Sequence, residues 1–333
     1  MNGKLNFAMY WGASCGGCEI AVLEIREKIL DLAQLINIVF WPVAVDFKYR
    51  DVEAMPDRHI DLCLFNGGIR NSENCEIAQL LRRKSKVLCA FGACACWGGI
   101  PSLANVSNRQ GIFRTVYLQS PSTENAGGLL PQELTPTRAG DLELPAFYDT
   151  LVPLSEVVEV DYFIPGCAPA ADRIWAVLEA VVTGQLPEPG SVVGALEKTL
   201  CDECKRVRDE TKKVKQFFRP HQIIPEPEKC LLEQGIICMG PATRGGCGAR
   251  CIEANMPCRG CYGPAPGVVD QGAKMLSAVA SLIDSQDPEE TDRIIAGIAD
   301  PLGTFYRFGL SASLLQRARL RAGEQPTLQE AAG

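Results

Sequence analysis

The chain has 333 residues, of which 47% are hydrophobic and 22% are charged, and its net charge is −7. These values are typical of a globular protein with about two domains. The acidic balance, and the lack of a basic stripe with interleaved aromatic residues, argue against nucleic acid as a partner. No run approaches the roughly 18 to 20 uncharged apolar residues that cross a bilayer, so no membrane span is predicted.

The first residues lack the pattern of a signal peptide, and we therefore expect a cytoplasmic protein. Disulfides are rare in that reducing compartment. The 16 cysteines of the chain are thus predicted to be metal ligands or buried thiols.

Short apolar runs alternate with segments of helical periodicity through the first half of the chain. The predicted strands are 5–11, 36–45, 60–65, 86–91 and 157–164, and the predicted helices follow residue 18 and cover about 75–83 and 170–183. This alternation, with Gly-rich turns after the strands, indicates an α/β fold with a doubly wound parallel sheet. Residues 101–153 show little periodicity, which predicts a long excursion over the surface or across a partner.

Three of the predicted strand-to-helix turns contain cysteine beside glycine. Ligands of such a sheet bind beyond the carboxyl ends of its strands, so the fold would assemble one four-thiolate site from Cys15, Cys18, Cys94 and Cys167. Zinc sites usually use two close ligand pairs, and this arrangement therefore favours an iron–sulfur cluster. A redox CxxC of the thioredoxin type is the alternative, but it leaves two of the four cysteines unexplained. The cysteines predicted to be structural are Cys63, Cys75, Cys89 and Cys96.

Pro187 and Pro189 mark the predicted boundary between a first domain, 1–186, and a second domain, 187–333. The second domain has enough cysteines for two four-thiolate sites, namely Cys201, Cys204, Cys230, Cys238, Cys247, Cys251, Cys258 and Cys261. Soft thiolates bind iron–sulfur clusters and zinc alike, so a zinc-stabilised interaction protein is an alternative. The cysteine-rich part has few large apolar residues, and metal sites are expected to supply much of its stability.

The grouping of these eight cysteines is open at this point. An interleaved pattern of the ferredoxin type, which is our preference, groups Cys201, Cys204, Cys230 and Cys261 against Cys238, Cys247, Cys251 and Cys258. A sequential pattern instead groups the four cysteines from Cys201 to Cys238 and the four from Cys247 to Cys261.

The cysteine turns resemble those of a known family. CGGCE (residues 15–19), GACACWGGIP (92–101) and PGCAP (165–169) are similar to the proximal-cluster motifs of the [NiFe]-hydrogenase small subunit. The later block CLLEQGIICMGPATRGGCGARC with PCRGCYGP resembles the version in cytoplasmic hydrogenases of methanogens and related anaerobes. The nearest resemblance is to the small subunits of methyl-viologen-reducing hydrogenases that partner heterodisulfide reductase, and it extends from Tyr10 to Phe308.

The resemblance implies a flavodoxin-like first domain and a loop-rich, ferredoxin-like second domain. Cys15, Cys18, Cys94 and Cys167 would bind a proximal [4Fe–4S] cluster, and the later eight would bind a medial and a distal [4Fe–4S] cluster. The chain would have no catalytic residue and no nickel–iron site, since that site would belong to a large subunit. Electrons from H2 would pass through the three clusters to a further subunit near the distal cluster, in the direction of heterodisulfide reductase.

Two other functions remain open beside this interpretation. One is the small subunit of an NAD(P)-reducing or deazaflavin-reducing hydrogenase. The other is an iron–sulfur electron carrier of a redox complex that is not a hydrogenase and resembles respiratory complex I.

One position departs from the family pattern. Many hydrogenase small subunits have a glutamate before the first proximal cysteine, associated with proton transfer, and this chain has Ser14 there. Glu19 lies nearby, and its place in the predicted first helical turn indicates a role in favouring the helix dipole.

Overall fold

A five-stranded parallel sheet forms the centre of the computed structural model, which describes residues 4–209, 213–283 and 285–315. Its strands are β1 (Leu5–Trp11), β2 (Ile36–Phe40), β3 (Ile60–Asn66), β5 (Ser85–Phe91) and β9 (Tyr162–Ile164). They lie in the order β2-β1-β3-β5-β9, and each neighbouring pair is parallel. When these five strands alone are numbered in chain order, the sheet order is 2-1-3-4-5. This is the flavodoxin-like order, and it confirms the predicted doubly wound fold.

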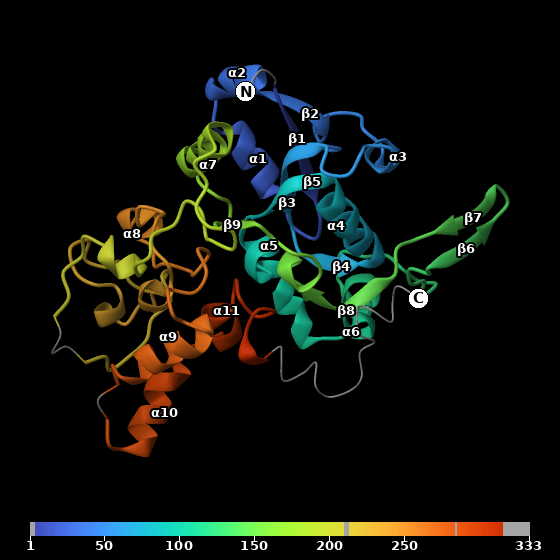
Figure 1. The fold of residues 1–333 in the computed structure, drawn as a ribbon. Helices are drawn as coiled ribbons and strands as arrows, with labels where there is room; N and C mark the ends of the chain where they lie inside the picture. The colour runs from blue at the N-terminus through green and yellow to red at the C-terminus, as the bar shows by residue number, and fades with distance from the viewer. Residues whose placement is uncertain (1–3, 210–212, 284, 316–333) are drawn as a thin grey trace.

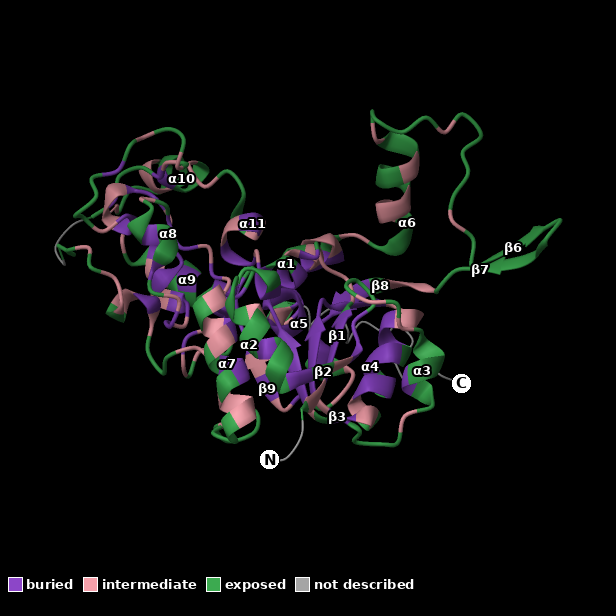
Figure 2. Ribbon diagram, turned by 90° about the horizontal axis from the view of Figure 1, so that it is seen from above, coloured by how far each residue is buried: buried purple, intermediate pink, exposed green. Residues whose placement is uncertain are grey.

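Helices cover both faces of the sheet (Figure 1). One face packs against α1 (Gly17–Leu23), α2 (Lys28–Leu35) and α7 (Ala171–Thr183), and the other packs against α3 (Tyr49–Glu53), α4 (Ser72–Lys84) and α5 (Ala93–Trp97). The sequence of β1 is almost continuously apolar because both faces of the strand are buried. Phe7 and Met9 enter one core, while Ala8 and Tyr10 enter the other. Figure 2 shows the resulting buried centre.

Strand β9 is shorter than the predicted 157–164. The residues before it pack their valines into the first core without joining the sheet. The Asp161 carboxylate then accepts hydrogen bonds from Arg82 at 2.6 Å and from the Leu88 backbone N–H at 2.7 Å. The valines of residues 157–160 are therefore packed in a loop that the Asp161 hydrogen bonds hold in place, and they do not extend the strand.

The excursion after the fourth strand of the sheet packs against the domain at its two ends and projects from it in the middle. It contains η1 (Ile100–Val106), α6 (Arg109–Phe113), η2 (Arg114–Gln119), the hairpin of β6 (Leu134–Thr137) and β7 (Gly140–Glu143), and β8 (Phe147–Val152), which pairs with β4 (Ile69–Asn71). Every residue of β6 and β7 is exposed, and Figure 2 shows the hairpin and α6 projecting from the sheet.

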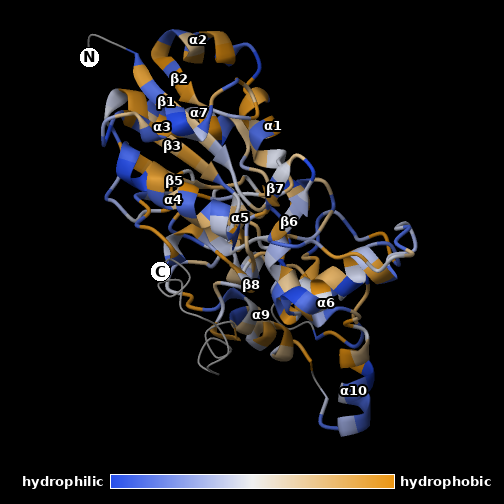
Figure 3. Cartoon of the chain, turned by 90° about the vertical axis from the view of Figure 1, so that its right-hand side faces the viewer, coloured by the Kyte–Doolittle hydropathy of each residue, from blue (hydrophilic) through white to orange (hydrophobic). Residues whose placement is uncertain are grey.

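The remaining chain is rich in loops, as predicted. Its regular elements are η4 (Leu200–Asp202), η5 (Leu232–Gln234), η6 (Gly240–Ala242), α8 (Arg250–Glu253), α9 (Gln271–Ala280), α10 (Pro288–Ala296) and α11 (Pro301–Phe305). The cysteine-rich loops share a third hydrophobic core with side chains from α9 to α11, such as Met275, Val279 and Phe305. In Figure 3 the strands and α9 carry hydrophobic residues, whereas α10 is mostly hydrophilic.

Candidate metal centres

The four cysteines predicted to form one site lie together at the carboxyl edge of the sheet. Cys15 and Cys18 follow β1, Cys94 follows β5 in α5, and Cys167 follows β9. Burial raises the pKa of the Cys94 thiol to about 12, and the nearby Cys167 and Cys15 thiols contribute to the rise. Cys18 and Cys94 are buried while Cys15 and Cys167 are exposed. The site thus faces both the core and the surface.

Glycines allow the backbone to approach these thiols closely. A Cβ atom on Gly92 (φ +84) would overlap the Cys18 Sγ, and one on Gly99 (φ +60) would lie 2.5 Å from the Cys94 Sγ. Only glycine tolerates both the space and the backbone angles at these positions. The Gly17 backbone N–H donates to the Cys15 Sγ at 3.4 Å. The turns therefore form a tight cradle that suits thiolate ligation of a metal group.

A second set of thiols encloses a cavity in the loop-rich region. Cys201, Cys204, Cys230 and Cys238 line this cavity, whose volume is about 310 Å³. Burial raises the pKa of Cys201 to about 12, and the Cys238 thiol adds to the effect. A Cβ atom on Gly240 would lie 3.1 Å from the Cys201 Sγ and 3.7 Å from the Cys238 Sγ. The turn at Gly240 thus brings the backbone between these two thiols.

The other four cysteines form a third set. Among the influences on the pKa of Cys261, which burial raises to about 12, are the Cys167, Cys247 and Cys251 thiols. Burial raises the pKa of Cys258, and the Cys238 and Cys261 thiols raise it further. These contacts favour the sequential grouping over the interleaved one that we preferred, because the turn at Gly240 lies against both Cys201 and Cys238 while Cys261 interacts with Cys247 and Cys251. The geometry matches the sequential grouping.

Backbone groups connect the third set of thiols with each of the other two. The Cys167 amide donates a hydrogen bond to the Cys261 thiolate and so counteracts the rise of its pKa on burial. The Cys258 N–H donates to the Cys238 Sγ at 3.3 Å. The set containing Cys247 therefore lies between the sheet-edge set and the Cys201 set.

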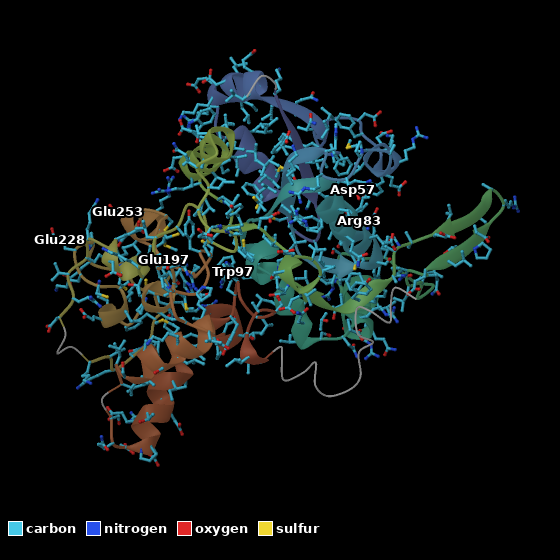
Figure 4. All side chains as sticks on the ribbon, viewed as in Figure 1. Asp57, Arg83, Trp97, Glu197, Glu228 and Glu253 are labelled. Carbon is cyan, nitrogen blue, oxygen red and sulfur yellow. The ribbon has the colours of Figure 1, made fainter. Side chains whose placement is uncertain are left out.

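Trp97 lies where the sheet domain meets the loop-rich region (Figure 4). Its ring stacks on Phe163 with the centroids 5.6 Å apart and the planes 8° apart. A Cβ atom on Gly263 (φ +77) would overlap the same ring, and the Ser311 hydroxyl donates to the Trp97 carbonyl at 3.2 Å. Our sequence reasoning did not single out Trp97, although its place one residue after Cys96 in a ligand-bearing turn was a usable signal.

Within the described ranges, no three Cys, His, Asp or Glu side chains are close enough to share a single metal ion. The four cysteines of the Cys201 set instead line one cavity together with eleven other residues. A cubane cluster takes one thiolate per iron around such a cavity, whereas zinc binds its four thiolates at about 2.3 Å from one ion. The donor chemistry and the cavity of this set fit an iron–sulfur cluster.

Comparison with known proteins connects these features to a family. Residues 15–181 match the family model described as NADH ubiquinone oxidoreductase, 20 Kd subunit. The iron-sulfur subunit of the F420-non-reducing hydrogenase of Archaeoglobus profundus is 41% identical over 94% of this chain and 98% of that protein. The corresponding protein of the F420-non-reducing hydrogenase of Methanothermobacter thermautotrophicus is 35% identical over 94% of this chain and 96% of that protein.

The chain belongs to this family of hydrogenase small subunits. It is thus an electron-transfer subunit of an oxidoreductase, as its cysteine motifs predicted, and such small subunits pair with a large subunit. The [NiFeSe] hydrogenase of Desulfovibrio vulgaris Hildenborough shares the fold, with a TM-score of 0.50 at 15% identity over 86% of this chain and 99% of that chain. None of the helices in the described part of the chain has the length and apolar character to cross a membrane.

The environment of Glu19 in this small subunit does not fit the role that we predicted for it. It lies in the first turn of α1, as expected, but it is only 3% exposed. Its carboxylate accepts a hydrogen bond from the Trp41 indole N–H, and burial raises its pKa. A buried carboxyl beside Cys18 is therefore a structural neighbour of the sheet-edge set and does not act as a surface charge for the helix dipole.

The four cysteines predicted to be structural are buried in the small subunit. Cys63, Cys75 and Cys96 belong to the first core and Cys89 belongs to the second. The Cys96 thiol donates to the Ala90 carbonyl at 3.3 Å, which turns it away from the sheet-edge set. These thiols behave as small hydrophobic side chains.

Proposed function

We propose that this small subunit holds three [4Fe–4S] clusters and relays electrons from H2 oxidation on the large subunit to a further subunit. The observation that carries this proposal is the arrangement of three four-cysteine sets, joined by the contacts of Cys167 with Cys261 and of Cys258 with Cys238. When bound, such clusters exchange one electron at a time. The chain supplies the thiolates, the order of the sites and the backbone donors around them.

The proximal cluster is assigned to Cys15, Cys18, Cys94 and Cys167. Two of these cysteines are exposed, and Trp11 and Ile20 beside them expose 41% and 58% of their surface. Exposed apolar residues of this kind around a ligand-bearing edge support a protein interface there. We assign this face to the large subunit, which would carry the nickel–iron site.

The medial cluster is assigned to Cys247, Cys251, Cys258 and Cys261, and the distal cluster to Cys201, Cys204, Cys230 and Cys238. Three of the distal cysteines are partly exposed, so the 310 Å³ cavity reaches the surface. Electrons would leave there to a docked partner. The relatives are named F420-non-reducing, which supports an acceptor other than a deazaflavin, and we propose a route towards heterodisulfide reductase in the cytoplasm.

Metal analysis of the purified complex tests this proposal. About twelve iron and twelve acid-labile sulfide per small subunit are expected from three cubane clusters. Nickel should co-purify with the large subunit, and H2 should drive viologen dye reduction. Zinc in place of iron, or an iron-loaded complex without nickel, would contradict the proposal.

A further inference from the structure

A second cavity, of about 440 Å³, shares no lining residue with the cavity that contains Cys201. Its lining includes the apolar residues Phe217, Ile236 and Ile298. Its polar lining consists of the three arginines Arg219, Arg259 and Arg307 together with His221, Asp300 and Thr304. The volume lies within the range of small-molecule sites, which is roughly 300 to 1,000 Å³.

Two of the arginines in this cavity are half-buried and lie near each other. Arg259 and Arg307 line the same cavity, and their charges are close enough to interact. Neither guanidinium belongs to an ion pair of the described residues. Like charges that are partly removed from water repel one another unless an anion lies between them.

The lining compensates little of the charge on Arg219 and Arg307, whereas Cys238, Cys251 and Cys258 interact favourably with Arg259. Arg307 donates from Nε to the Gly303 carbonyl at 2.8 Å, so its remaining N–H groups are not used by that bond. Asp300 is the one acid in the lining, and its carboxylate accepts from the Gly303 N–H at 2.8 Å to cap α11. The cavity is therefore a concentrated positive site on a chain whose net charge is −7.

We propose that this cavity binds the oxyanion group, a phosphate or a carboxylate, of a small molecule with an apolar body. Arginine is suited to this role because its planar guanidinium binds such groups through two parallel hydrogen bonds. Arg259 and Arg307 hold the oxyanion, the exposed Arg219 attracts it, and the apolar body packs against Phe217, Ile236 and Ile298. The proposal is independent of the number of clusters and of the electron acceptor.

The test uses the intact, cluster-loaded complex in a phosphate-free zwitterionic buffer. Phenyl phosphate and benzoate are titrated separately by calorimetry, and neutral phenol serves as the control for the apolar body alone. We expect at least one of the two anions to bind and phenol to bind at least tenfold more weakly. The phosphate and carboxylate arms then identify the preferred oxyanion.

Matched arginine variants locate the binding. Arg307→Gln should raise the Kd at least tenfold, and Arg219→Gln, at an exposed position, should raise it several-fold. Arg293→Gln is the control, because Arg293 on α10 is exposed and donates from Nε to a carbonyl four residues earlier, as Arg307 does. The control should bind as the wild type does.

Thermal unfolding without any anion separates a binding role from a structural one. Removing one of two like charges should leave the melting temperature of Arg307→Gln unchanged or higher, while the stabilisation by added anion is lost. The proposal is overturned if neither anion binds the wild type, or if Arg307→Gln and Arg219→Gln bind as tightly as Arg293→Gln. A lower melting temperature of Arg307→Gln in anion-free buffer would also overturn it, since Arg307 would then support the fold.

Discussion

The sheet domain and the cysteine-rich region hold their thiols in different ways. In the sheet domain, two hydrophobic cores pack the strands against helices, and of the four cysteines at the sheet edge Cys18 alone belongs to a core. In the cysteine-rich region, Cys238 and Cys258 are members of the core itself, and Cys204, Cys230 and Cys247 pack against it. The thiols of the sheet domain thus lie mostly outside its cores, whereas most thiols of the cysteine-rich region pack in or against its core.

Iron removal should have the largest effect and should separate the two regions. Without metal, the close thiols of residues 201–261 lose the group that holds their loops, so this region should lose its structure. The sheet should persist on its own cores. Hydrogen exchange after anaerobic chelation should show fast exchange in 201–261 and slow exchange in β1, β3 and β5; simultaneous loss of protection in both regions would break the comparison.

A substitution at the sheet edge should remove the proximal cluster and leave the other two in place. Gly92→Ala places a methyl group on the Cys18 Sγ, and we expect loss of about four of about twelve iron atoms per chain. Gly184→Ala is the matched control, because Gly184 also has a positive φ (+69) but has open space around its Cβ position. The measurement is iron content with cluster electron paramagnetic resonance. Equal iron loss in both variants would assign the effect to backbone strain.

Removing a helix cap should slightly lower the stability of the sheet domain and should leave the clusters unchanged. The Asn71 side chain accepts from the Asn74 N–H at 2.8 Å at the start of α4. Asn71→Ala should lower the free energy of unfolding of the sheet domain by about 1 kcal/mol, the usual value of such a cap. Denaturant unfolding measures this loss, and a fall in iron content would show that the two regions are more strongly coupled than their separate cores indicate.

The sequence was sufficient to predict the sheet and its ligand-bearing turns, because both follow from local patterns. Apolar runs marked the strands, and a parallel sheet brings its carboxyl ends to one edge, so Cys15, Cys94 and Cys167 could be placed together. The later cysteines lie in loops without periodicity. Their grouping depends on the turn at Gly240, which no local pattern revealed.

Contacts between residues that are distant in the chain could not be predicted from the sequence either. Glu19 is buried because Trp41, 22 residues later, covers and binds its carboxylate. The contact between Cys167 and Cys261 joins two regions whose relative placement depends on packing around Trp97. Both features arise from tertiary structure and not from residue pattern.

The most direct test of the account is the double variant Cys201→Ala/Cys238→Ala in the hydrogenase complex. The sequential grouping places both cysteines in one cluster, so about eight iron atoms per small subunit should remain. H2 should then still reduce two clusters whose electron paramagnetic resonance signals are unchanged from the wild type. Alteration of two of the three cluster signals by this variant would contradict three sequential sites.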